Sequence, residues 1–354
     1  MIDLYLKKVL YVSFIAVLLL ASSIAYGKDT LQLTMDGAID LALKQNPSVL
    51  DAQRNLDDAK TTLEEKEADP TTLILELTQA KNSFVNAQVQ LNYTKLQVTQ
   101  TVRDNYFTVL EAQNQLNLAK KQLDIANKNL DITKAKKAQG NATDSDVIQA
   151  ENSVISSQNS VAQAQASLKN ATDKLALSLG IDVSTPVTLT DVGFNEVNIS
   201  LDGLGKQAQD NLPTVVQAKN NATLAQLQFD LANNDYTPQD QIRTVKSSLL
   251  AAQSNLQQVL DNLSVSIQSS YQNVINALNQ VKLQEKNLSL AQKNLDTDRV
   301  RYKVGSITQV QLMNTELSLM SAENNYKSAV YNYYRALDSL ALATGVSLVQ
   351  KSAK

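Results

Sequence analysis

The chain has 354 residues, of which 43% are hydrophobic, and a formal net charge of -3. It is long enough to bury the core of one or two domains, and its charge argues against a nucleic-acid partner, which would require clustered basic residues. Cysteine and histidine are absent, which excludes thiol nucleophiles, disulfides, imidazole bases and the usual zinc ligands. We therefore expect no enzyme, no cofactor and no metal site.

Residues 1–27 have the order of charge, apolar run and small side chains that is typical of an export signal. Two lysines precede the apolar run 9–21, and cleavage is plausible after Ala25 or Gly27. The run is too short for a confident membrane span. An uncleaved N-terminal anchor is the alternative.

The rest of the chain contains an internal repeat, which must be recognised before a fold is predicted. MDGAIDLALKQNPSVLDAQ (35–53) corresponds to LDGLGKQAQDNLPTVVQAK (201–219), and further on the offset settles at 165 residues, as between Gly140 and Gly305. The sequence is a tandem duplication.

Each repeat reads as a short, a medium and a very long helix, then a tight turn and a long return helix. The chain has only 9 glycines and 5 prolines, so few residues interrupt these helices. The medium helices open at Pro47 and Pro213, and the very long ones at Pro70 and Pro238. The predicted divisions are a first repeat at 28–180 with its turn at 139–143, a short strand or linker at 181–199, a second repeat at 200–346 with its turn at 304–308, and a tail at 347–354.

Apolar residues recur every seven positions on the long helices, which predicts coiled-coil packing. The outgoing helix of the first repeat has Val102, Val109, Leu116, Leu123 and Leu130 in this spacing. The turns are short, so outgoing and return helices must be antiparallel neighbours. If 71–138 is one helix, it spans roughly 100 Å.

Further apolar tracks on the same helices, such as Leu283 and Leu290, indicate that each helix touches a second neighbour. A helix with contacts on two sides belongs in a sheet or ring of helices. The predicted fold is all-α: two tandem repeats of long antiparallel coiled-coil hairpins. A solid four-helix bundle is the alternative.

The sequence resembles the TolC family of outer-membrane efflux channels. The resemblance is carried by LTMDGAIDLALKQNPSV (33–49), by the two-fold repeat, and by YKVGSITQVQLMNTE (302–316) followed by YNYYRALDSLALATG (331–345). It implies a homotrimer in which each chain forms one third of an α-helical barrel. It also implies the exit duct of a tripartite efflux or type I secretion system, working with an adaptor protein and an inner-membrane transporter.

The chain departs from the family where that family inserts membrane strands. The insertion points fall near 67–70 and 233–238, and the residues there continue into helical periodicity. We therefore expect little or no β-barrel. The expected location is the cell envelope, with the exported protein associated with the outer membrane by another means.

The hairpin turns are the candidate functional site. A left-handed turn conformation favours glycine, and a threonine can cap the return helix. By resemblance, the adaptor contacts are Gly140, Thr143, Val304, Gly305, Ser306 and Thr308, and the pore constriction is formed by Asp144, Asp146, Tyr302, Gln311 and Asn314.

The family's acidic pair falls on Gln311 and Asn314 in this chain. We expect a neutral constriction to lose strong cation selectivity, because rings of carboxylates concentrate cations. Gating would then use amide and tyrosine hydrogen bonds, such as one from Tyr302 to Asp146. The alternative is that these residues only cap and pack the turns.

Two other functions stay open from sequence. One is an exported structural coiled coil or interaction protein without a pore. The other is the adaptor itself, which is disfavoured because adaptors usually carry one hairpin within a β-rich domain.

Overall fold

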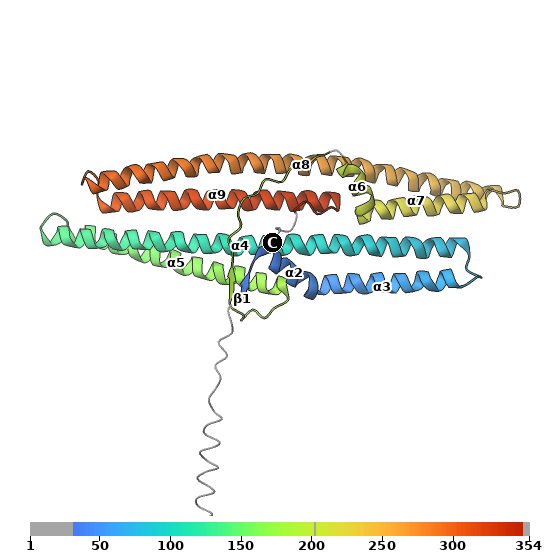
Figure 1. Cartoon of the computed structure of the whole chain (residues 1–354), viewed down its shortest axis with the longest axis horizontal. Helices are drawn as coiled ribbons and strands as arrows, with labels where there is room; N and C mark the ends of the chain where they lie inside the picture. Colours follow the sequence, from blue (N-terminus) through green and yellow to red (C-terminus); the bar gives the residue numbers. More distant parts are fainter. Residues whose placement is uncertain (1–30, 202, 350–354) are drawn as a thin grey trace, which may run out of the picture.

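Two long helical hairpins lie side by side along one direction in the computed structural model (Figure 1). The structure describes residues 31–201 and 203–349, so the predicted export signal lies outside it. The first repeat comprises α2 (Met35–Gln45), α3 (Pro47–Ala68), α4 (Ile74–Ala138) and α5 (Asp144–Leu179). The second comprises α6 (Leu204–Asn211), α7 (Pro213–Ala232), α8 (Gln239–Lys303) and α9 (Gln309–Thr344).

The long helices α4 and α8 each run the whole length of the molecule (Figure 1). In the first repeat, α3 packs on one half of α4 and α5 on the other; α7 and α9 flank α8 in the same way. The repeats meet where α4 contacts α9 and α7. The result is a layer of helices in the order α5, α4, α9, α8, which confirms the predicted tandem hairpins.

Local sequence explains where the helices begin and end. Pro47 opens α3, and the side chain of Asn46 caps that helix by accepting from Ser48 N at 2.9 Å. Gly180 and Gly345 end α5 and α9 in the left-handed conformation, which costs glycine no Cβ clash.

The seven-residue apolar track forms the core of each hairpin. Val102, Val109 and Leu116 on α4 are buried, and Leu175 on the return helix packs into the same cluster as the first two. Burial of such side chains contributes about 1.5 to 3 kcal/mol each. The packing is therefore that of the predicted coiled coil.

Two short strands brace the middle of the first repeat. β1 (Leu31–Leu33) pairs in parallel with β2 (Val187–Leu189). The hydroxyl of buried Tyr106 lies 2.9 Å from Leu33 O and 2.6 Å from Thr190 O, and its one proton is shared between these two carbonyls. The sequence predicted a strand or linker where β2 lies. It did not predict β1, because a three-residue strand has too little periodicity to be detected.

The connections between the medium and the long helices are short turns. At 69–73, Asp69 accepts from Thr71 N at 2.8 Å, and α4 begins four residues after Pro70 instead of at it. At 233–238, Asn234 accepts from Tyr236 N at 2.9 Å, and Pro238 immediately precedes α8. Both segments are turns without strands, as the sequence predicted.

The segment between the repeats, residues 190–201, crosses the helical layer from β2 toward α6 (Figure 1). Tyrosines of α9 hold it in place: Tyr334 and Tyr333 hydroxyls accept from Asn195 N and Val197 N, each at 3.0 Å. Asp191 accepts from the Tyr331 hydroxyl at 2.9 Å and pairs with Lys327. The motif YNYYR is thus largely structural.

The Asp191 contacts predict a pH dependence of this crossing segment. Burial alone would raise the pKa of Asp191, but hydrogen bonds from Lys327 and Tyr331 outweigh it and hold the pKa below its ordinary value. A depressed carboxyl pKa stabilises the fold above about pH 4 and loses that contribution as the pH falls below it. We expect amide exchange at Asn195 and Val197, corrected for its intrinsic pH dependence, to accelerate below pH 4. In the Asp191→Asn variant these two amides should exchange faster at neutral pH and show no acceleration below pH 4. An acceleration that persists in this variant would contradict the assignment of the pH dependence to Asp191.

None of the helices within 31–201 and 203–349 has a stretch apolar enough to cross a membrane.

Candidate functional site

The two hairpin turns lie at the same end of the molecule and have nearly the same backbone (Figure 1). Gly140 and Gly305 both adopt positive φ, 75° and 72°. The preceding residues Gln139 and Val304 also match, with φ, ψ of -96°, 6° and -91°, 7°. The duplication therefore reproduces the turn geometry closely.

Each return helix begins with a reciprocal cap of the kind predicted for its threonine. Thr143 Oγ1 accepts from Asp146 N at 3.2 Å, and Asp146 Oδ2 accepts from Thr143 N at 2.7 Å. Thr308 and Gln311 make the same two bonds, at 3.2 and 2.8 Å. The bonds from the backbone and then the side chain of Thr143 lower the pKa of Asp146.

The candidate constriction residues divide into two groups. Asp146 and Gln311 are engaged in the caps, and Asp144 pairs with Lys137. Tyr302 and Asn314 point their exposed side chains to solvent from the second hairpin. Among the described residues no hydrogen bond joins Tyr302 to Asp146, whose Oδ2 accepts from Thr143 N and Oγ1.

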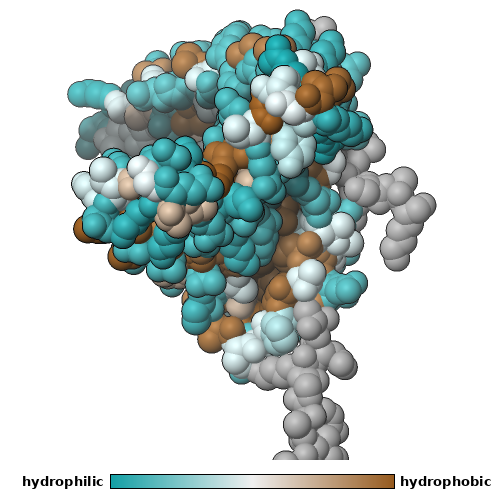
Figure 2. Space-filling model, turned by 90° about the vertical axis from the view of Figure 1, so that its left-hand side faces the viewer, coloured by the Kyte–Doolittle hydropathy of each residue, from teal (hydrophilic) through white to brown (hydrophobic). Residues whose placement is uncertain are grey.

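Seen from the end that carries the turns, the surface is largely hydrophilic with scattered apolar patches (Figure 2). Ser306 N closes the second turn by donating to Arg301 O at 2.9 Å, and Asn141 N donates to Lys136 O at 2.8 Å in the first. Backbone hydrogen bonds thus close both turns, and most residues of the turns are exposed to solvent.

The outer helices of the layer, α5 and α8, each expose apolar side chains seven residues apart. On α5 these are Ile148 and Ile155, 56% and 54% exposed, and on α8 they are Leu283 and Leu290, 51% and 58% exposed. The sequence indicated the second pair as an extra track. The first pair was missed, because Ile148 and Ile155 directly follow residues of the seven-residue core track, Val147 and Val154.

A polar network between the repeats was not anticipated from the sequence. Arg103 of α4 and Asp338 of α9 form an ion pair, and each residue is only 6% exposed. Beside it, Arg335 pairs with Asp104 at 2.6 Å and with Glu111 at 3.0 Å. The one signal available was the presence of charged residues inside apolar tracks, in VRDNY and RALDS.

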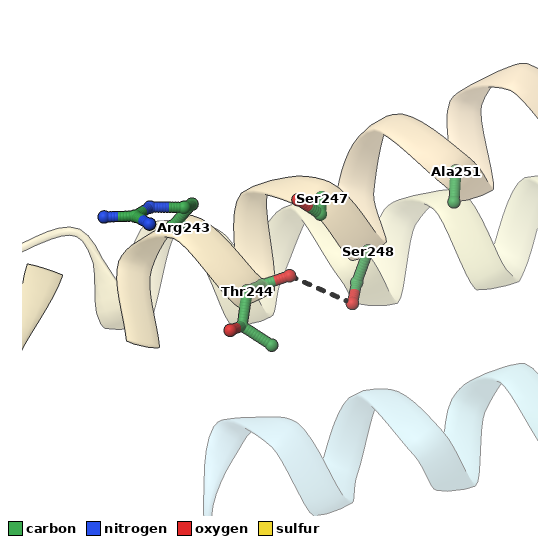
Figure 3. A pocket seen from close by; sticks show the side chains of 5 residues that line it. All are labelled: Arg243, Thr244, Ser247, Ser248 and Ala251. Atoms are coloured by element: carbon green, nitrogen blue, oxygen red, sulfur yellow. Dashed lines mark hydrogen bonds between the residues drawn. The ribbon is translucent and has the colours of Figure 1, made fainter. Parts of the chain in front are cut away.

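A shallow groove of about 440 Å³ lies at the start of α8 (Figure 3). It is lined by Arg243, Thr244, Ser247, Ser248 and Ala251, all from one helix. Ser248 and Thr244 hydroxyls donate to carbonyls one turn earlier, at 3.2 and 2.9 Å, so the lining polar groups do not converge on a ligand. No group of three metal-ligating side chains occurs among the described residues.

Comparison with known proteins agrees with this geometry. The family model described as outer membrane efflux protein matches residues 73–181 and 239–346, one segment in each repeat. No curated protein matches the chain in sequence.

Solved structures match over most of both chains. The Vibrio cholerae outer membrane protein VceC is 14% identical with a TM-score of 0.62, covering 89% of this chain and 97% of that one. The Campylobacter jejuni CmeC outer membrane channel is also 14% identical, with a TM-score of 0.61 and coverage of 90% and 87%. A membrane protein from Pseudomonas aeruginosa is 11% identical, with a TM-score of 0.65 and coverage of 88% and 90%. These likenesses show the fold, and the family model covers more than half of the sequence. The resemblance to TolC-family channels is thereby confirmed, and the chain belongs to the outer membrane efflux protein family.

Proposed function

We propose that this protein is the exit duct of a tripartite efflux or type I secretion system in the cell envelope. The observation that carries the proposal is an open layer of four long helices whose two edges, α5 and α8, expose apolar side chains at coiled-coil spacing. Such edges need partners, and a second copy supplies one at each edge.

One exposed apolar residue of each edge lies at the same height. Ile155 follows Gly140 by fifteen residues and Leu290 precedes Gly305 by fifteen, so each lies about 22 Å from its turn along the helix. Packing α5 of one copy on α8 of the next is a head-to-tail contact, which either closes a ring or continues as a filament. The family resemblance favours closure as a homotrimer.

A ring of such helices encloses a passage too wide for its own side chains to fill. Substrates would pass from an inner-membrane transporter and an adaptor that contacts the turns at Gly140, Thr143, Val304, Gly305, Ser306 and Thr308. We propose that the narrowest point is formed by Asp144, Asp146, Tyr302, Gln311 and Asn314, whose mixed amide and acidic character favours weak ion selectivity. Caps involving Asp146 and Gln311 would hold this end in a fixed shape.

Substituting the exposed edge residues tests ring closure. Ile155→Asn and Leu290→Asn should each remove an apolar contact at the edge. Each should raise the dissociation constant of the trimer at least tenfold and so shift the protein toward monomer. Light scattering after size-exclusion chromatography measures this. Val183→Asn, in the exposed loop after α5, is the control and should leave the mass unchanged. A wild-type protein that is a stable monomer would exclude the duct and favour an exported coiled coil without a pore.

The transport role is tested by deleting the gene. Dyes and antibiotics should accumulate in the deletion strain, and the wild-type gene should restore their export. Unchanged accumulation and unchanged protein secretion would exclude the proposed duct even if the trimer forms.

A further inference from the structure

Large apolar side chains are exposed at the far end of the molecule, opposite the hairpin turns (Figure 1). The far end consists of the turns 69–73 and 233–238 and the helix ends that they join. Apolar side chains gathered at one place, unlike single scattered ones, mark an interaction surface. The exposed ones at this end are Leu73 (66%), Ile74 (55%), Leu231 (52%) and Tyr236 (97%).

Helices α4 and α7 bring part of this patch together. They run antiparallel and meet at Asn220, whose side chain donates to Asn86 Oδ1 at 2.9 Å and whose carbonyl accepts from Asn82 at 3.4 Å. Toward the far end, Ile74 lies eight residues beyond Asn82 and twelve beyond Asn86, and Leu231 lies eleven beyond Asn220. Both are therefore roughly 16 Å from these bonds along their helices. Ile74 and Leu231 thus lie at the same height on neighbouring helices.

These side chains belong to the inner helices of the layer and not to its edges. At the far end the helices follow the order α3, α4, α7, α8, so a second copy in the ring packs on α3 or α8. Leu73 and Ile74 stand at the start of α4, and Leu231 stands near the end of α7. Each of these two helices already has a neighbour of its own chain on both sides. Ring closure therefore leaves this part of the patch uncovered.

The charge around the patch is acidic. Within residues 67–80 and 220–242 every charged side chain is aspartate or glutamate. The two glutamates are neutralised, because Lys66 lies 2.6 Å from Glu76 and Lys81 lies 3.6 Å from Glu67. The aspartates of these two segments have no ion pair among the described residues, and they are Asp69, Asp230, Asp235 and Asp240.

We propose that the far end docks a protein other than this chain, whose contact surface has an apolar socket bordered by lysine or arginine side chains. Tyr236 is the expected anchor, because a fully exposed aromatic side chain gains most from entering a socket. The basic border follows from charge complementarity with the four aspartates. The same charge disfavours an anionic bilayer and the far end of another copy, since both are negative. The contact needs no passage, so the inference goes beyond the proposed duct and holds for a rod without a pore.

Photo-crosslinking in living cells tests the docking. With p-benzoylphenylalanine at position 236, where one aromatic side chain replaces another, we expect an adduct with another protein through a peptide that contains lysine or arginine. The same probe at position 183, in the exposed loop after α5, should not give this adduct. Absence of an adduct from position 236, or an adduct only with this chain or with lipid, would overturn the proposal.

Two aspartates in the same local setting test whether charge drives the contact. Asp230 and Asp261 each accept from Nε2 of the glutamine four residues earlier, at 2.8 and 2.9 Å, but Asp261 lies well inside α8. Asp230→Asn combined with Asp235→Asn should reduce the adduct from position 236 at least about fivefold, and Asp261→Asn should leave it unchanged. All three aspartates are exposed, so circular dichroism should stay that of the wild type. An adduct that persists in the Asp230→Asn, Asp235→Asn variant would contradict the basic border.

Vesicle binding separates a protein partner from a lipid surface. The purified protein should not co-sediment with vesicles of phosphatidylcholine, either alone or mixed with phosphatidylglycerol. Co-sedimentation that Tyr236→Ser abolishes would assign the far end to lipid and overturn the proposal. The duct is decided separately by trimer mass and gene deletion. Unchanged export together with a charge-dependent adduct would exclude the duct and support the docking.

Discussion

Asp338→Ala should destabilise the protein by about 3 to 5 kcal/mol at pH 7.5, the cost typical of removing one partner from a buried ion pair. Arg103 would keep its charge in a site where each partner is only 6% exposed. Burial raises the pKa of the Asp338 carboxyl to about 6, with Arg103 opposing the shift, so the pair is ionised at that pH. Chemical denaturation followed by circular dichroism measures the loss, at one fixed protein concentration because assembly contributes to stability.

Two comparisons isolate the buried charge as the cause. Glu64→Ala breaks the exposed pair of α3 with Lys60, 3.5 Å apart, and should cost about 0.5 kcal/mol or less. The double variant Arg103→Met, Asp338→Leu removes both charges and should recover most of the loss, since apolar replacements of a buried pair are often neutral or stabilising. A double variant as unstable as Asp338→Ala would show that the site requires the ion pair itself.

Gly345→Ala should lower the free energy of unfolding by about 3 kcal/mol, because the backbone there is left-handed and the site is crowded. Its φ is 66°, and an added Cβ would lie 2.6 Å from Asn211 O. The left-handed conformation costs a residue with a Cβ about 1 to 2 kcal/mol, and overpacking against backbone adds about 1 to 3 kcal/mol. The same denaturation measurement applies.

The first repeat supplies the matched control. Gly180 is the equivalent residue, with φ of 73°, but the nearest atom to an added Cβ is Gln45 Cβ at 3.4 Å. Gly180→Ala should therefore lower the free energy of unfolding only by the cost of the left-handed backbone conformation, about 1 to 2 kcal/mol. Equal losses at both glycines would mean that contact between α6 and the end of α9 contributes nothing to this effect.

The sequence by itself determined the features that depend on neighbours along the chain. Helix lengths follow from seven-residue tracks that few glycines or prolines interrupt. The turn at Gly305 and the cap at Thr308 follow from local conformational preference and from hydrogen bonds over three residues. The duplication is visible in the sequence alone, and it makes the second hairpin predictable from the first.

Only the tertiary structure decided which residues from distant parts of the chain meet. It pairs Arg103 with Asp338 across 235 positions, brings β1 against β2, and leaves Ile155 exposed on α5. A charged residue in an apolar track has no assigned partner in sequence, since several faces of a long helix could turn toward a neighbour. The order of helices in the layer fixes those faces, because it sets which side chains are buried within the chain and which stay exposed at the edges.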